Sequence, residues 1–388
     1  MKTKYDNRDL YTEYGSLKSK RDNTEINSYN ADVNMIVGRR SNGKTYPTVT
    51  FDGVKEFIDS GYKHACAYVR RFDSDFRIGQ LGTLLFSNGC VSNGWLKWYT
   101  KGEWNDIYYY RGAWYLRFLN EEGKVTKKCN QPVCYAFSIN QCEKYKGADH
   151  PDITTIILDE FIPMKSERGY ITGEWQLWQN IVSSIVRERG DVKIYMLANT
   201  ISKNCPYFDH YNIDIDDIEQ GSINIFTYKG GLVLALEYCK DDGDTHIESS
   251  KYFEIDDTDN MITKGTWETD EYPTLKNSPF RHYQDYLCFN PVFIKQNSKY
   301  LRIDFLSTDE KLMMYVHKTT TPPTRDTDVL YVENFRDIDI HKTNSRIGFN
   351  PKVYQLDAAI MKMYLNNQVY YQSNDIGEKF KYFLENTK

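Results

Sequence analysis

The chain has 388 residues, with 49 Lys and Arg against 54 Asp and Glu, and a formal net charge of −5 at pH 7. Its 40% hydrophobic and 27% charged residues are typical of a globular protein, which excludes collagen-like, disordered and disulfide-scaffold classes. Neither an apolar run of about 18 residues nor a signal-peptide core is present, so we expect a cytoplasmic protein without a membrane span. The length favours two domains.

The charge is unevenly distributed along the chain. Residues 1–208 carry a net +5, residues 209–276 carry −12, and residues 277–388 carry +2. The overall acidic balance argues against non-specific coating of nucleic acid but allows a local basic surface. The centre of the acidic block is polar and rich in Asp, as linkers are. We therefore predict a first domain over 1–240, a linker over 241–283 and a second domain over 284–388.

A phosphate-binding motif follows the first apolar run. Residues 33–37 (VNMIV) have strand character and lead into GRRSNGKT, which matches G-x-x-x-x-G-K-T without a mismatch. Glycines in such a loop let successive N–H groups face one point, where they hold phosphate oxygens together with the next helix N-terminus. The predicted nucleotide-binding residues are Gly38, Arg39, Arg40, Ser41, Asn42, Gly43, Lys44 and Thr45. A chance match in a glycine turn is the alternative, which the preceding strand disfavours.

The motif also assigns individual roles in binding ATP and Mg²⁺. Lys44 places its ammonium on the β- and γ-phosphates, and the Thr45 hydroxyl coordinates Mg²⁺. Residues 153–158 (ITTIIL) predict a buried parallel strand that ends at Asp159 and Glu160. Asp159 is placed to bind Mg²⁺, and Glu160 to orient and deprotonate the attacking water. The alternative for these two carboxylates is a helix N-cap pair.

A third polar strand end completes the predicted site. Residues 192–198 (VKIYMLA) run into Asn199, which is either a sensor of the water and γ-phosphate or a turn-forming residue. With a further strand at 64–69, the order predicts an α/β parallel sheet with ligands at the carboxyl ends of the strands. The additional strand and the catalytic Glu160 favour the RecA-like (ASCE) branch of P-loop ATPases.

Residues 94–118 are rich in Trp and Tyr. The segment IYYYRGAWYLRF predicts a hairpin around Arg111 and Gly112. Aromatic and basic residues together can form a stacking platform for bases, but more often they are packed strands, which is the interpretation we favour.

Several segments, in order, resemble the DNA-packaging (encapsidation) ATPases of small Picovirinae-type tailed bacteriophages. They are MIVGRRSNGKTY, AYVRRF, FSINQCEK, TTIILDEFI, VRERGDVKIYMLANTIS, NPVFIKQNSKY and IMKMYLNNQVYYQSN. The resemblance implies a ring-forming ATPase, a pentamer in the family, that drives double-stranded DNA through the portal into a procapsid. It would work in the host cytoplasm, transiently docked on the procapsid.

The resemblance also implies roles for basic residues. Arg187 matches a finger that acts on the ATP of the neighbouring subunit, with Arg189 as the nearby competitor. Lys144 matches a second trans-acting residue, and the alternative for these cations is a solvated helix end. Arg70 and Arg71 match paired arginines that would contact nucleotide, a neighbour or DNA.

Past residue 284 the sequence predicts strands followed by helical turns, which suits the degenerate ribonuclease-H-like (RNase-H-like) α+β domain of the family. Large terminases use such a domain as a two-metal nuclease. Asp304, Asp337 and Asp339 are the carboxylates that would serve this alternative. Because the family packages unit-length genomes, we favour a module that binds DNA, the portal or a structural RNA.

Overall fold

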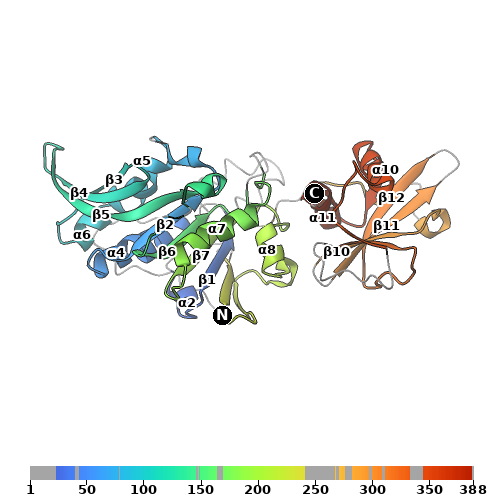
Figure 1. Cartoon of the computed structure of the whole chain (residues 1–388), viewed down its shortest axis with the longest axis horizontal. Coiled ribbons are helices and arrows are strands. Elements are labelled where there is room, and N and C mark those ends of the chain that lie inside the picture. The colour runs from blue at the N-terminus through green and yellow to red at the C-terminus, as the bar shows by residue number, and fades with distance from the viewer. Residues whose placement is uncertain are drawn as a thin grey trace. The chain divides into compact units, whose positions relative to one another are not determined.

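The computed structural model (Figure 1) describes residues 23–39, 43–77, 79–145, 147, 149–163, 169–240, 267, 271–275, 282–296, 299–307, 311–332 and 344–386. These residues divide into two compact units. The first unit comprises the described residues of Met1–His210 and Ile215–Glu268, and the second those of Tyr211–Asp214 and Thr269–Lys388.

The described part of the first unit is built on one nine-stranded sheet. Its strands are β1 Val33–Gly38, β2 Ala65–Arg70, β3 Asp106–Tyr110, β4 Ala113–Leu119, β5 Val125–Ser138, β6 Ile153–Asp159, β7 Lys193–Asn199, β8 Ser222–Thr227 and β9 Val233–Tyr238. They lie in the order β3-β4-β5-β2-β6-β7-β1-β9-β8. The segment from β5 to β9 is parallel, whereas β3, β4 and β8 add antiparallel edges.

The four strands predicted at 33–37, 64–69, 153–158 and 192–198 are confirmed as β1, β2, β6 and β7. They occupy the middle of the sheet and are almost wholly buried, because their apolar side chains are covered on both faces. The antiparallel strands at the two edges add to the predicted parallel sheet. Short connections join β3 to β4 and β8 to β9, and such connections are possible only between antiparallel neighbours.

Short helices pack on this sheet, together with one longer helix. They are α2 Thr24–Asn27, α3 Thr45–Pro47, η1 Thr48–Lys55, α4 Glu56–Asp59, η2 Asp73–Phe76, α5 Leu81–Phe86, η3 Ser87–Val91, α6 Trp95–Tyr99, η4 Ile139–Tyr145, α7 Glu174–Val186, α8 Pro206–His210 and η5 Ile215–Asp217. Helical residues run from Thr45 to Asp59, with π-helical geometry over η1. The helix that follows the phosphate-binding motif therefore begins at Thr45, as the motif requires. None of the described helices has the length and apolar character needed to cross a membrane.

The aromatic segment forms the predicted hairpin, β3 and β4, with its turn at Arg111 and Gly112. Both turn residues have left-handed φ angles, of 49° and 84°, the geometry of a two-residue type I′ turn. Trp95 and Trp114 are 2% and 1% exposed and lie in the main hydrophobic core. The packing interpretation is therefore confirmed for these two tryptophans.

The second unit contains a six-stranded sheet among its described residues. The strands are β10 Val292–Gln296, β11 Lys299–Ser307, β12 Leu312–Thr319, β13 Val329–Val332, β14 Asn344–Ile347 and β15 Val369–Tyr371. The order is β14-β13-β10-β11-β12-β15. Strands β10, β11 and β12 form an antiparallel meander, and the other pairings are parallel.

Helices α10 Gln355–Leu365 and α11 Asn374–Asn386 pack on this sheet, and η9 Tyr283–Tyr286 precedes it. The strands and helices predicted past residue 284 are thus present. The exception is β15, which lies within a stretch predicted to be helical. Its three residues, VYY, are strong strand formers and add to β12, so tertiary pairing decides their conformation.

Candidate nucleotide-binding site

The predicted site residues meet at one edge of the first sheet. Gly38 is the last residue of β1 and pairs in register with Asn199, the last residue of β7. Asp159 ends β6, the next strand along. Because β1, β6 and β7 are parallel, their carboxyl ends face the same edge, where ligands of open α/β sheets bind.

Lys44 connects the phosphate-binding motif to β7. Its ammonium donates to the carbonyls of Gly38 (3.1 Å) and Arg39 (2.7 Å) and to Oδ1 of Asn199 (3.1 Å), and the residue is only 6% exposed. Asn199 therefore lies inside the site rather than in a distant turn. Arg40, Ser41 and Asn42 lie outside the described residues.

Thr45 and Asp159 provide the oxygen atoms of the predicted Mg²⁺ site. Thr45 Oγ1 lies 3.5 Å from Oδ2 of Asp159, which also accepts a hydrogen bond from the Tyr68 hydroxyl. A hydroxyl and a carboxylate are ligands that Mg²⁺ prefers, so these residues fit the ion. Burial raises the pKa of Asp159, and the positive charge of Arg70 opposes this rise.

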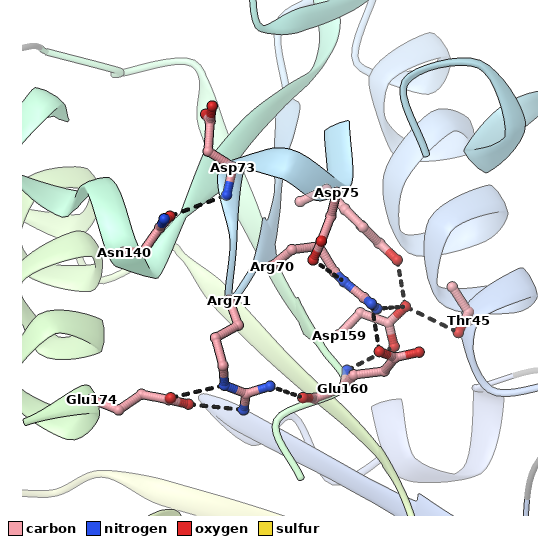
Figure 2. A network of polar contacts seen from close by, with 10 residues as sticks. Thr45, Arg70, Arg71, Asp73, Asp75, Asn140, Asp159, Glu160 and Glu174 are labelled. Atoms are coloured by element: carbon pink, nitrogen blue, oxygen red, sulfur yellow. Dashed lines mark hydrogen bonds and ion pairs between the residues drawn. The ribbon is translucent and has the colours of Figure 1, made fainter. Parts of the chain in front are cut away.

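Arg70 lies at the centre of a group of carboxylates (Figure 2). Its guanidinium is in ionic contact with Glu160, lies 3.5 Å from Asp159 and lies 3.4 Å from Asp75. Burial disfavours the charged guanidinium, but the surrounding Tyr68, Asp159 and Glu160 raise the pKa of Arg70 overall. The carboxylate of Glu160 is thus held by a cation of its own chain.

The backbone of Glu160 is unusual, because its φ angle is +57°. A left-handed conformation costs a residue other than glycine about 1–2 kcal/mol, so the surroundings must stabilise it. Asp159 contributes by accepting the Glu160 N–H through Oδ1 at 3.1 Å.

A pocket of about 440 Å³ opens beside these residues. It is lined by Arg70, Arg71, Phe72, Ser74, Asp75, Arg77 and Glu160. The pocket gives small solutes access to the end of β2 and to the turn after β6.

Comparisons with known proteins agree with this geometry. Residues 127–380 match the family described as podovirus DNA encapsidation protein (Gp16). The chain belongs to this family. The matched stretch includes Asp159, Glu160 and Asn199 of the encapsidation-family chain, and the phosphate-binding motif precedes it.

Two curated relatives of this encapsidation-family chain are DNA packaging proteins. The protein of Bacillus phage B103 is 26% identical over 197 residues, covering 50% of this chain and 51% of the relative. The protein of Bacillus phage phi29 is 24% identical over 186 residues, covering 48% of each. The aligned region thus spans about half the length of these curated relatives.

Two solved structures share the fold. One is the Phi-28 gp11 DNA packaging motor, with a TM-score of 0.56, 16% identity, and coverage of 94% of this chain and 98% of the other. The other is the bacteriophage Phi-29 viral genome packaging motor assembly, with a TM-score of 0.54, 17% identity, and coverage of 95% and 99%. At these identities the likeness concerns the fold alone.

Three further cations of the family chain are candidates to act in trans: Arg187 with its competitor Arg189, and Lys144. Arg187 follows the last residue of α7, where its side chain is 45% exposed, 3.4 Å from the Ser184 carbonyl and 3.6 Å from Asp149. Lys144 is exposed near the end of η4. The guanidinium of Arg189 instead donates to four backbone carbonyls, those of His150, Pro151, Ile153 and Ile185.

Of the three carboxylates named for the nuclease alternative, Asp304 is the one that lies within the described residues of the second unit. Asp304 is 1% exposed on β11 and accepts from Arg302 Nε (2.7 Å) and from His317 Nε2 (2.9 Å). Asp337 and Asp339 lie outside the described residues. Within the described parts of the chain, no cluster of three His, Cys, Asp or Glu side chains is arranged to hold a metal.

Sequence reasoning missed Tyr68 as a site residue. Its ring is buried in the core beside Trp114, and its hydroxyl donates to Asp159. The available signal was its position two residues before Arg70 on a buried strand, which places both side chains on one face.

Proposed function

We propose that this chain is the ATP-driven motor that moves double-stranded viral DNA through the portal into a procapsid. One observation carries the proposal: Lys44, Thr45, Asp159, Glu160 and Asn199 gather at the carboxyl edge of one parallel sheet in a member of the encapsidation family. The curated relatives are DNA packaging proteins, which supports the choice of DNA as substrate.

The site residues divide the work of ATP hydrolysis among them. Backbone N–H groups of the Gly38–Thr45 segment and the Lys44 ammonium hold the phosphates. Thr45 and Asp159 hold Mg²⁺, which when bound neutralises charge on the β- and γ-phosphates. Asn199 uses Oδ1 to orient Lys44, so its amide N–H₂ is left to donate to the γ-phosphate or the water.

Glu160 accepts the proton of the attacking water. Its carboxylate is 34% exposed and contacts Arg70, so it lies at the boundary between the site and solvent. Arg70 also stabilises Asp159 in its charged form, which metal binding requires.

We propose that a homo-oligomeric ring, a pentamer by analogy with the resembled packaging ATPases, completes the site. Arg187 and Lys144 would reach the ATP of the neighbouring subunit, where such a finger accelerates phosphoryl transfer by about 10³–10⁵. The exposure of Arg187 supports its choice over Arg189, whose guanidinium is committed to four carbonyls. The ring would act in the host cytoplasm while docked on the procapsid.

For the second unit we propose a degenerate RNase-H-like domain, over about residues 284–388, that binds DNA, the portal or a structural RNA. The antiparallel meander β10–β12 with parallel strands added on either side supports this assignment. The large-terminase alternative is disfavoured, because both oxygens of Asp304 are engaged by Arg302 and His317.

Steady-state ATP hydrolysis tests the proposal, measured with and without double-stranded DNA for the wild type and Glu160→Gln. We expect turnover that rises with DNA and is lost in the variant. Glu122→Gln is the control, because this carboxylate is 68% exposed and pairs with Lys124. Protection of DNA from DNase after addition of procapsids then reports packaging. A wild type that binds ATP without turnover at every protein concentration would refute the motor.

A further inference from the structure

We infer that Arg71 and Glu174 form a buried clamp that positions Glu160 for water activation. The inference rests on the proposed ATP hydrolysis at this site. Arg71 follows the last residue of β2, and its guanidinium donates to Glu174 and to the carbonyls of Glu160 and Phe161, so both members of the pair are positioning residues. The clamp acts through the backbone of the turn that follows β6.

The two side chains meet as a fork on a carboxylate (Figure 2). Arg71 Nε donates to Glu174 Oε2 at 2.8 Å, and Nη2 donates to Oε1 at 2.9 Å. The side chains are 6% and 1% exposed. Two parallel hydrogen bonds between a buried guanidinium and a carboxylate fix the relative orientation of the two groups, whereas a single hydrogen bond would allow them to rotate.

The same guanidinium holds the turn that carries Glu160. Arg71 Nη1 donates to the carbonyl of Glu160 at 3.2 Å, and Nη2 donates to the carbonyl of Phe161 at 3.1 Å. These two carbonyls belong to the two successive peptide bonds that follow the left-handed Glu160. A strained conformation persists only where its surroundings over-determine it, and Arg71 supplies two such constraints. Because φ of Glu160 decides where its Cβ points, the clamp aims the carboxylate.

Glu174 is itself fixed from several directions. It is the first residue of α7, and its carboxylate also accepts the Ile171 N–H at 2.8 Å and the Tyr207 hydroxyl at 2.9 Å. Every strong acceptor position is used, so the carboxylate cannot rotate without losing a partner. The clamp therefore ties the Glu160 turn to the start of α7 and to α8.

The contribution of the Arg71–Glu174 pair to the stability of the fold does not by itself explain why the pair is buried here. Burying an arginine–glutamate pair costs desolvation of both charges, and an apolar pair of similar volume is often as stable or more so. The contacts of Arg71 converge instead on the carbonyls of Glu160 and Phe161. We take this convergence as the sign of a positioning role.

Steady-state kinetics of Arg71→Lys and Glu174→Gln test the clamp. Lysine at position 71 keeps the positive charge but cannot form the bidentate contact with Glu174. Glutamine at position 174 keeps the shape of the side chain but weakens that contact. We expect kcat to fall about 10–100-fold, because a small displacement of a reacting group has an effect of this size, while KM for ATP changes less than about threefold. Tyr207→Phe is the matched control: it removes one donor to Glu174 but leaves the fork intact. Wild-type kcat in both clamp variants, or equal losses in kcat and ATP affinity, would overturn the inference.

Chemical rescue separates positioning from a general structural role. In Arg71→Ala the pocket that Arg71 lines would admit free guanidinium to the place of the missing group. Guanidinium at millimolar concentration should restore kcat at least fivefold, whereas ammonium and urea should not. Arg77 lines the same pocket and its side chain is exposed. Arg77→Ala is therefore the control, and guanidinium should not change its kcat. Equal responses of the two alanine variants to guanidinium contradict the clamp.

Amide hydrogen exchange provides a readout that does not need turnover. In Arg71→Lys, amide exchange over residues 160–162 should be at least tenfold faster, while exchange in β1 stays as in the wild type. Unchanged exchange at the turn contradicts the clamp even if the chain proves not to hydrolyse ATP. Conversely, suppose that the wild type shows no ATP turnover while Arg71→Lys still shows the faster exchange at the turn. That result refutes the proposed hydrolysis and leaves the positional role of the clamp in place.

Discussion

At the scale of single residues, the site depends on side chains whose contacts give each of them one role. Lys44 is buried among oxygen acceptors from β1, Arg39 and β7, so its ammonium is desolvated and held in place before phosphate arrives. Asn199 supplies one of those acceptors. Its side chain therefore links the phosphate-binding lysine to the neighbouring strand.

Asn199→Ala should impair turnover more than binding. The substitution removes one acceptor from Lys44 and the amide that we propose donates to the γ-phosphate or water, so we expect kcat to fall about 10²-fold, as for loss of one transition-state donor. The affinity for ATP, measured by titration of a fluorescent analogue, should change less than fivefold. Ser202→Ala is the control, because its hydroxyl bonds only locally, to Asn204. Equal losses for the two variants would exclude a sensor role.

Alanine substitutions of Arg187 and Arg189 should have clearly different effects on the free energy of unfolding. Arg189 donates to four carbonyls at the junction of α7 and β6, so Arg189→Ala should lower the free energy of unfolding by about 2 kcal/mol. Arg187 is 45% exposed, and Arg187→Ala should leave that free energy within about 0.5 kcal/mol. Chemical denaturation monitored by circular dichroism measures both. The reverse ranking would remove the structural reason for choosing Arg187 as the trans-acting finger.

At the scale of elements, the β3–β4 hairpin supports the site from the core. Trp114 contacts the rings of Tyr68, Phe76, Phe86 and Tyr109, and its indole N–H donates to the Gly82 carbonyl at 2.9 Å. Tyr68 in turn donates to Asp159. The hairpin therefore packs directly against a residue that donates a hydrogen bond to Asp159, the carboxylate that we propose binds Mg²⁺.

Trp114→Ala should destabilise the first unit strongly, by about 3–5 kcal/mol, because it leaves a large cavity and removes the indole donor to the Gly82 carbonyl. Tyr110→Ala on the same hairpin should cost less than about 0.5 kcal/mol, because Tyr110 is 51% exposed. Thermal or urea unfolding measures the difference. Comparable effects of the two substitutions would mean that the hairpin aromatics are not core residues.

Strand β11 of the second unit carries a structural carboxylate. Asp304→Ala leaves Arg302 and His317 without their shared acceptor, so the second unit should lose roughly 1–3 kcal/mol of stability. Asp326→Ala, at an exposed position in the same unit, is the control. Plasmid incubated with Mg²⁺ or Mn²⁺ should remain uncut by the wild type. Cleavage that disappears in Asp304→Ala would instead establish the terminase alternative.

At the scale of the whole molecule, the proposed ring makes each site the joint property of two subunits. In a ring with head-to-tail interfaces, every subunit offers a Glu160 to one neighbour and an Arg187 to the other. Arg187→Ala and Glu160→Gln should each be inactive alone. Mixed in equal amounts, about a quarter of the interfaces combine an intact Glu160 with an intact Arg187, so ATP turnover should return. Persistent inactivity of the mixture, with assembly verified by light scattering, would exclude a trans-acting Arg187.

Much of the site was predictable because its signals are local in sequence. The spacing from Gly38 to Thr45 encodes a phosphate-binding turn, and the apolar run before Asp159 encodes a buried parallel strand. Parallel strands present their carboxyl ends at one edge, so the proximity of Thr45, Asp159 and Asn199 followed from topology alone. The Trp and Tyr content of the hairpin, by contrast, left open whether its rings would pack or be exposed.

Only the tertiary structure decided what the remaining polar groups do. Arg70 and Arg71 are adjacent and chemically identical, yet one contacts the site carboxylates and the other is buried against Glu174, 103 residues away. Strand β15 formed because β12 offered it a partner, against the helical pattern around it. By itself the sequence determined the central strands β1, β2, β6 and β7 and the helix that begins at Thr45, because these depend on nearby residues. The partners of buried charges depend on segments far apart in the chain, which only the folded structure brings together.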